Sequence, residues 1–295
     1  MAKIGVLTTE FDGPTFEEVV DQVAAHQISS VQLQLGSVIR DVPTVDALMR
    51  GLDALGDKIT GDVADRSREV LDARGIEVAG VDGTYNMVHP DPDRRARNLD
   101  HLVRLINLAS RFGTRIVTLC TGTRDDVMWR PHEDNQSDAA WADLVAQLRV
   151  ATKAAEAAGV QLAFEPEYNN VVNSAQRARR LIDEVGSPAL KVLMDGANLF
   201  HHGDLDRMQD HLRDSFSLVG KDIVLAHAKD LDHDGDAGGR AAGQGRLDYS
   251  LYLSELQSSG FDGAIVLHQL KELAPDRLDT AFQYVRDLAP GGYLR

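Results

Sequence analysis

The sequence predicts an α/β fold, a single (β/α)8 barrel that spans residues 1–295 as one domain. Eight short apolar runs alternate with longer amphipathic segments, and such alternation implies a parallel sheet. The runs are almost uninterruptedly apolar, as parallel strands covered on both faces are. Eight units fill the 295 residues, close to the roughly 250 residues of this fold. An open doubly wound sheet is the competing fold, but the segment after the first run lacks its glycine-rich dinucleotide turn.

Each predicted strand is a run rich in Val, Ile and Leu, and each predicted helix places apolar side chains three and four positions apart. The strand runs lie at residues 4–8, 31–35, 77–81, 115–119, 161–165, 191–194, 223–226 and 264–267. The clearest helical stripes lie within residues 94–112, 141–152 and 278–288. Residues 43–74 are predicted to hold two short helices, and the glycine-rich residues 235–245 are predicted to form a loop.

Local signals mark where helices begin and end. Thr15, followed three residues later by Glu18, fits a capping box at the start of the first helix. Five helical patterns are followed by a glycine, the residue best suited to the left-handed conformation that often ends a helix. These glycines are Gly75, Gly113, Gly159, Gly186 and Gly260.

Composition excludes several classes of protein. The chain has 46 acidic and 31 basic side chains, a formal charge of −15, which opposes binding to nucleic acid or to an anionic membrane. The lone cysteine, Cys120, permits no internal disulfide and indicates a reducing compartment. The first apolar run is too short for a signal peptide, and no run approaches the roughly 18 residues of a membrane span. We therefore expect a cytoplasmic protein.

Four polar side chains follow the last four predicted strands, where the active site of such a barrel forms. They are Glu165, Asp195, His227 and His268. Two carboxylates and two imidazoles that converge there would be costly to desolvate without a cation between them. We therefore predict one divalent metal ion bound by these four residues. Mixed oxygen and nitrogen ligands favour manganese, with zinc, cobalt, magnesium and iron as alternatives.

Four motifs carry a resemblance to a known family. They are Glu165-Pro166-Glu167, the 194–200 segment MDGANLF, His227-Ala228-Lys229-Asp230 and the 243–249 segment GQGRLDY. Together they resemble the xylose isomerase-like TIM barrel superfamily, in the group of sugar phosphate isomerases and epimerases. The resemblance covers essentially the whole chain and implies a TIM barrel. It also implies one divalent metal held by Glu, Asp, His and Glu from strands five to eight, of which Glu165, Asp195 and His227 match the first three.

The fourth family ligand does not match, because His268 stands where a second glutamate is expected. In epimerases that the chain resembles, two metal-bound glutamates remove and return a proton beside a carbonyl, and the metal stabilises the enediolate. Glu165 can be one base, and the second proton-transfer group would be His268 or a neighbour such as Glu167. Histidine can transfer protons near neutral pH, but not while its acceptor nitrogen binds metal. We favour His268 as a ligand.

Other polar or aromatic residues near the strand ends are predicted to bind substrate. Asn86 and His89 follow the third strand, and His89 has the alternative role of a helix cap. The 124–137 loop supplies Trp129 and His132, and this Trp would either stack on a sugar or pack on a neighbouring subunit. The remaining three are Asn198, Lys229 and Arg240. A homodimer is an expectation from the family alone.

Three functions are consistent with these residues. The first is a metal-dependent isomerase or epimerase that acts on a small keto sugar through proton abstraction beside its carbonyl. The second is a metal-dependent lyase or hydrolase that cleaves keto-glycosides by elimination, which needs one base and one acid and so suits the change from Glu to His at position 268. The third is a phosphodiesterase similar to the apurinic endonucleases, which is disfavoured by the negative charge and by the lack of a ligand after strand two.

Overall fold

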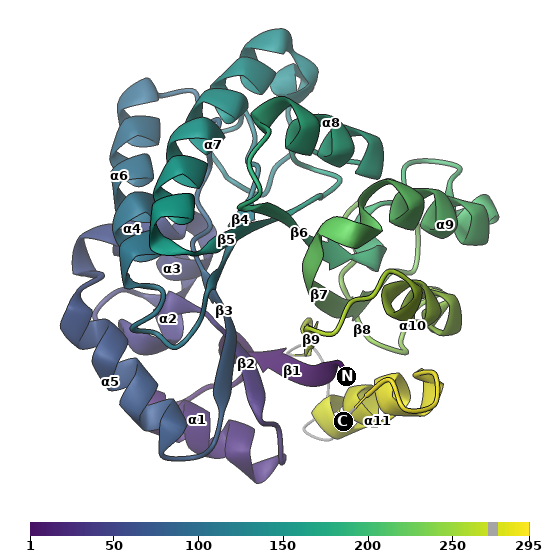
Figure 1. The fold of residues 1–295 in the computed structure, drawn as a ribbon, viewed down its shortest axis with the longest axis horizontal. Helices are drawn as coiled ribbons and strands as arrows, with labels where there is room; N and C mark the ends of the chain where they lie inside the picture. Colours follow the sequence, from purple (N-terminus) through teal and green to yellow (C-terminus); the bar gives the residue numbers. More distant parts are fainter. Residues whose placement is uncertain (271–276, 295) are drawn as a thin grey trace.

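The computed structural model describes residues 1–270 and 277–294 and forms a closed barrel with helices outside a central ring of strands (Figure 1). Eight parallel strands pair in sequence, and β9 closes the ring between β7 and β1. This arrangement confirms the predicted (β/α)8 fold. The barrel strands are β1 (Lys3–Leu7), β2 (Ser30–Leu33), β3 (Glu77–Asp82), β4 (Ile116–Cys120), β5 (Gln161–Glu165), β6 (Leu190–Asp195), β7 (Ile223–Asp230) and β9 (Ala264–Leu267).

The strands bury apolar side chains on both faces, which explains their uninterrupted apolar runs. Inside the barrel, side chains from opposite strands form one small cluster: Leu7, Ala163, Leu193, Leu225, Ala264 and Val266. A much larger apolar cluster lies between the strands and the surrounding helices. The interior is therefore packed, and in barrels of this kind the site forms at the rim where the strands end.

The helices follow the apolar stripes, although their bounds differ from the predicted ones by a few residues. They are α1 (Phe16–Ala25), α2 (Leu35–Val38), α3 (Thr44–Arg50), α4 (Leu52–Leu55), α5 (Gly61–Asp72), α6 (Pro92–Leu108), α7 (Asp138–Ala158), α8 (Ala175–Val185), α9 (Met208–Val219), α10 (Tyr249–Ser258) and α11 (Arg277–Leu288). Thr15 caps α1 by accepting a hydrogen bond from the Glu18 amide. The five glycines predicted to end helices all have positive φ.

Two local predictions were wrong. Residues 43–74 hold three helices, α3, α4 and α5, with a 3₁₀ turn between the last two, instead of two helices. Gly51 divides the first pair because its φ is 52°, a conformation that suits glycine. The 235–245 segment also contains a strand, β8 (Arg240–Ala241), which pairs antiparallel with the end of β7.

A charged cluster fixes α3 and α4 against α6. The Asp53 carboxylate is 5% exposed and accepts hydrogen bonds from four side chains. These donors are Arg50, Arg94, Arg97 and Asn98. Burial alone would raise the pKa of Asp53, but the four hydrogen bonds outweigh burial and hold the pKa below its usual range. We call these five residues the Asp53 cluster.

A second buried carboxylate shapes the loop after β7. Asp230 is fully buried and accepts hydrogen bonds from four backbone amides, at distances of 2.9–3.2 Å. The amides belong to Leu231, Gly243, Gly245 and Leu247. The glycines of the 243–249 motif therefore allow the backbone to curl around this side chain. In the part of the chain that the structure describes, no helix is long and apolar enough to cross a membrane.

Candidate active site

Strand geometry brings the predicted ligands to one rim. Glu165 and Asp195 are the last residues of β5 and β6, and His227 lies in β7 as the register partner of Asp195. His268 directly follows β9. Parallel strands end on the same side of the barrel, so each side chain faces the same opening.

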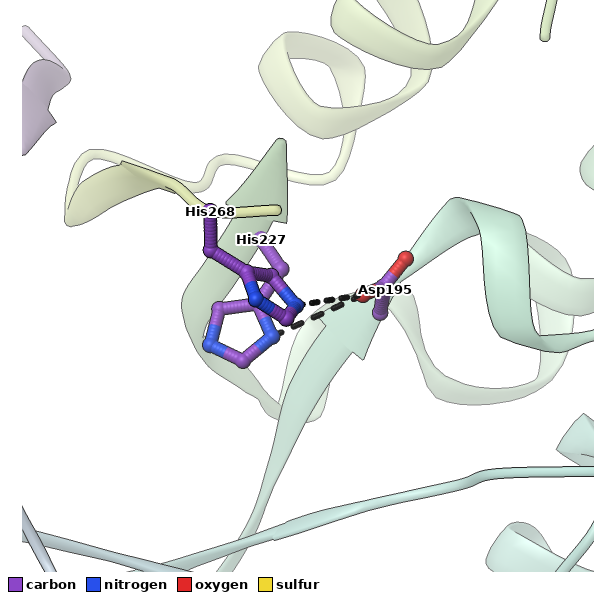
Figure 2. Close-up of side chains that lie close together, drawn as sticks. All are labelled: Asp195, His227 and His268. Carbon is purple, nitrogen blue, oxygen red and sulfur yellow. Dashed lines mark ion pairs between the residues drawn. The ribbon is translucent and has the colours of Figure 1, made fainter. Parts of the chain in front are cut away.

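Asp195, His227 and His268 form a compact group, which we call the candidate metal triad. One ligand atom from each lies within 4.8 Å of the others. Figure 2 shows both imidazole rings directed at the Asp195 carboxylate. The Oδ2 atom of Asp195 is 3.5 Å from His227 Nδ1 and 3.9 Å from His268 Nε2. Glu165 adjoins this group through His227, with Oε1 3.4 Å from Nδ1.

The triad atoms that face one another are buried without a hydrogen-bond partner. They are Asp195 Oδ2, His227 Nδ1 and His268 Nε2. A buried polar atom left unsatisfied typically costs about 1–3 kcal/mol, so three such atoms together need an explanation. A divalent cation among them would satisfy all three, and a set of one carboxylate and two imidazoles suits zinc, manganese, cobalt or iron. The residues present therefore fit a metal ion.

A chain of hydrogen bonds behind His227 fixes which ring nitrogen faces the triad. The Nε2 atom of His227 is 2.9 Å from Gln32 Oε1, and Gln32 Nε2 donates to Thr118 Oγ1 at 3.2 Å. Thr118 Oγ1 in turn donates to Asp82 Oδ1 at 3.3 Å. Because Gln32 uses its amide nitrogen on Thr118, its oxygen accepts the proton of Nε2. The second proton of the ring is then on Nδ1, and its loss leaves on Nδ1, beside Asp195, the lone pair that a metal ligand needs.

Burial and neighbouring charges shift the pKa values of all three triad residues. Burial alone would lower the pKa of His227, but Glu165 and Asp195 outweigh burial and raise this pKa to about 9. Burial would likewise raise the pKa of Asp195, but Lys229 and the two imidazoles hold it below its usual range. Burial, reinforced by His227 and Lys229, lowers the pKa of His268 well below its ordinary value, so this ring is neutral. A neutral imidazole is the form that binds metal.

A cavity of about 510 Å³ opens over the triad. Glu165, Glu167, His227, Lys229 and His268 all contribute to its lining. β5 ends at Glu165, so Glu167 lies just past the strand, yet its side chain is buried in the cavity wall. Burial, followed by the charge of Glu165, raises the pKa of Glu167 to about 8.

Three of the residues predicted to bind substrate lie at or beside this cavity. Lys229 lines the cavity, and its Nζ is 3.4 Å from Asp195 Oδ2. Trp129 also lines it. Asn198 is fully buried, and its Nδ2 donates to Glu165 Oε1 at 2.6 Å. The structure therefore places Asn198 behind the Glu165 carboxylate, as a residue that orients it.

The other four predicted substrate residues make contacts away from the cavity. Asn86 bridges two loops, since it donates to Asp125 O and accepts from Thr123 N. His89 accepts from the Asp91 amide and contacts Arg94, beside the Asp53 cluster. His132 accepts from the Asp134 amide at the start of a 3₁₀ turn, and Arg240 donates to Asp232 on the surface. None of these four is among the cavity-lining residues that the structure describes.

Several residues of the site carry no clear signal in the sequence. Gln32 and Thr118 lie inside predicted strands, and the signal for Gln32 was a polar side chain within an apolar run. Glu10, after β1, lines the cavity and accepts hydrogen bonds from the amides of Gln269 and Leu270. It thereby holds the segment that begins with His268, a contact between chain ends that no local pattern indicates.

The fold and the site define a (β/α)8 barrel with a candidate metal centre at the carboxyl ends of β6, β7 and β9. Residues 42–288 match the xylose isomerase-like TIM barrel family, and the chain belongs to this family. A 3-dehydroshikimate dehydratase of Pseudomonas putida is 26% identical over 64% of this chain, and the match spans 29% of the relative's length.

Two solved structures illustrate the similarity of fold. A 3-keto-D-glucoside 4-epimerase of E. coli has a TM-score of 0.67 at 17% identity, over 98% of this chain and 99% of its own. D-psicose 3-epimerase of Clostridium cellulolyticum H10 has a TM-score of 0.69 at 16% identity, over 97% of this chain and 99% of its own. At these identities the similarity establishes a shared barrel.

Proposed function

We propose that the chain is a metal-dependent isomerase or epimerase that removes a proton beside the carbonyl of a neutral keto sugar. One observation carries the proposal: three buried ligand atoms without a hydrogen-bond partner converge beneath a cavity that is also lined by Glu165 and Glu167. Two carboxylates beside a metal site are the groups that proton transfer at a carbon acid requires.

The residues that would hold the ion are Asp195, His227 and His268, with Glu165 adjoining. When bound, the ion would supply a positive charge that polarises a substrate carbonyl. Glu165 is the base in this proposal, because its carboxylate borders both the triad and the cavity. Asn198 donates to Oε1 of Glu165, so Oε2 is the oxygen assigned to receive the proton.

Glu167 is the second proton-carrying group in this proposal. It lies two residues beyond Glu165 and lines the same cavity. Its buried position in the cavity wall keeps bulk water away from the carboxyl, as a group that returns a proton to substrate requires. Lys229 is held by Asp195 and is positioned to donate a hydrogen bond to a substrate oxygen.

The charges of the cavity favour an uncharged substrate. Four acidic side chains line it: Glu10, Asp82, Glu165 and Glu167. Lys229 is the one lysine or arginine among the lining residues that the structure describes, and it is already paired with Asp195. A phosphate or carboxylate group on the substrate would therefore find no unpaired lysine or arginine among these described residues, and it would lie close to the carboxylate of Glu165. This supports a neutral sugar over a sugar phosphate or a carboxylate such as 3-dehydroshikimate.

A lyase that acts on keto-glycosides is the second candidate. His268 occupies the fourth ligand position, which leaves Glu165 and Glu167 as an unequal pair on one chain segment instead of two matched bases. Elimination needs one base and one acid and is compatible with such a pair. The sequence similarity to a 3-dehydroshikimate dehydratase also supports an elimination reaction.

Proton exchange in D₂O separates the candidates. The manganese-loaded protein is incubated with a panel of free keto sugars and keto-glycosides and followed by NMR. Deuterium uptake with formation of an isomer supports the isomerase, and loss of the group on the adjacent carbon supports the lyase. A metal-loaded protein that catalyses neither exchange nor cleavage on any member of the panel contradicts both.

A further inference from the structure

The outer wall of the cavity is apolar and is not used by the proposed chemistry. Leu48 and Met49 of α3 line the cavity, and each remains 40% exposed. Val45 of the same helix is 70% exposed. Three of the five exposed large hydrophobic residues in the described part of the chain therefore lie on one seven-residue helix at the opening of the site.

Trp129 extends this wall from the loop between β4 and α7. Its indole Nε1 donates to the Leu48 carbonyl at 3.2 Å. The indole has this one donor and no acceptor, so the ring offers the cavity an apolar surface and no hydrogen bond. Such a surface suits stacking against a planar group.

The fold holds the wall in place. Gly51, at the end of α3, packs so closely on the backbone of Thr84 that a Cβ atom would lie 1.9 Å from the Thr84 carbonyl oxygen. The next amide, of Leu52, donates to that same oxygen at 2.9 Å. The Asp53 cluster then ties α4 to α6. The apolar surface is therefore preorganised, which limits the entropy that a ligand would lose on binding.

The wall is continuous with the candidate active site. Leu48, Met49 and Trp129 line the same cavity as His227 and Glu165. At about 510 Å³ the cavity falls in the range of clefts that bind drug-sized ligands, roughly 300–1,000 Å³. It therefore has room for a further group beyond a single sugar ring.

We propose that the wall formed by Leu48, Met49 and Trp129 is a binding subsite for an apolar, planar substituent attached to the sugar. The substrate is then a glycoside with an aromatic aglycone, and not a free sugar. This inference rests on the proposed function, because it assigns the sugar itself to the region of the triad. The aglycone stacks on Trp129 and covers Leu48 and Met49 of α3 when it binds.

Binding of two matched probes tests this subsite without any turnover. The dissociation constants of phenyl β-D-glucoside and methyl β-D-glucoside are measured by calorimetry on the manganese-loaded protein. We expect the phenyl compound to bind about 10- to 100-fold more tightly, the range over which an apolar pocket discriminates. Trp129→Ala should bring the ratio of the two dissociation constants (methyl over phenyl) close to one. Trp129→Phe should keep most of the preference for the phenyl compound.

Val45→Ser is the matched control, because Val45 lies on α3 but does not line the cavity; its ratio should equal that of the wild type. If Trp129→Ala fails to fold, Leu48→Ser tests the same wall and should also lower the ratio. A wild-type ratio near one overturns the proposal. So does a dimer, detected by sedimentation, that Val45→Ser dissociates, because α3 would then be covered by a second copy of the chain.

The outcome is separable from that of the proposed function. A high ratio in a protein that exchanges no substrate protons supports the subsite and contradicts the proposed reaction. Proton exchange on free keto sugars, together with equal affinity for the phenyl and methyl glucosides, supports the proposed reaction and contradicts the subsite.

Discussion

Two buried carboxylates in this barrel have opposite surroundings. Asp53, on α4, accepts hydrogen bonds at both carboxylate oxygens from side chains of α3 and α6. Asp195, at the end of β6, accepts one hydrogen bond at Oδ1 from the Ala197 amide, and its Oδ2 has none. The first charge is hydrogen-bonded to four side chains of the fold, and the second has Lys229 at 3.4 Å but faces two imidazole nitrogens that have no hydrogen-bond partner.

This difference separates a structural charge from a functional one. A carboxylate with every partner supplied by the chain contributes to stability and has no capacity left for a ligand. A buried carboxylate with an unsatisfied oxygen costs stability and is kept where it binds something. Burial alone would not have distinguished Asp53 from Asp195.

The largest contrast should come from removing each charge in turn. Asp195→Asn should abolish retention of a divalent ion, because the ion loses its carboxylate ligand, whereas Asp53→Asn should retain it. Both variants and the wild type are loaded with Mn²⁺, passed through gel filtration and analysed by mass spectrometry for metal per chain. A wild-type protein that emerges without metal, like Asp195→Asn, would refute the metal assignment.

Glu165→Gln should lower kcat by about 10²–10⁴-fold, the usual contribution of a general base. The amide keeps the shape and the hydrogen bond from Asn198 but cannot accept the substrate proton. Steady-state rates on whichever keto sugar shows exchange provide the measurement. Glu133→Gln, on an exposed part of the 124–137 loop, is the control and should match the wild type. Full turnover by Glu165→Gln would remove the base assignment.

Gln32→Leu should weaken metal binding about 10- to 100-fold, the usual effect of losing a partner that orients a metal-bound histidine. His227 then loses the acceptor that holds its proton on Nε2. Competition with a fluorescent chelator gives the affinity. Gln136→Leu, a change at an exposed glutamine, is the control and should leave the affinity for the metal unchanged. If Gln32→Leu also leaves it unchanged, the hydrogen-bond chain behind His227 is not needed for metal binding.

The smallest effect should be on stability, where Asp53→Asn should cost roughly 2 kcal/mol at pH 7, as expected for hydrogen bonds to a charged group. The pKa of Asp53 lies below its usual value, so this contribution is complete above about pH 5. It is lost as the pH falls through the folded-state pKa. Urea unfolding at pH 7 and pH 3 measures the difference between wild type and variant, which should shrink at the lower pH. A constant difference would place the stabilisation elsewhere than in the charge.

The sequence predicts the barrel well because its signals are local. A parallel strand buried on both faces reads as an apolar run wherever it occurs, and each of the eight runs became a strand. The positions of the residues at the strand ends are equally predictable, since all strands of this fold end on the same face of the barrel. By this rule the sequence alone predicts that Asp195, His227 and His268 share one rim of the barrel.

Residues whose roles depend on the path of a loop were not predictable. Asn86 and His89 follow β3 closely in sequence, yet their side chains bond to neighbouring loops and to α6. Gln32 contacts a histidine 195 positions away. These contacts depend on how loops and distant strands meet in space, which a single sequence without the fold does not record.

The anchoring of the loop after β7 by Asp230 has a practical consequence for protein engineering. One carboxylate grips the backbone on both sides of residues 232–242, through the amides of Leu231, Gly243, Gly245 and Leu247. Both ends of this stretch are therefore fixed by Asp230. The stretch includes three residues that line the cavity: Ala237, Gly238 and Gly239. Sequence variation introduced between these two fixed ends should change the lining of the cavity while the barrel beneath keeps its shape.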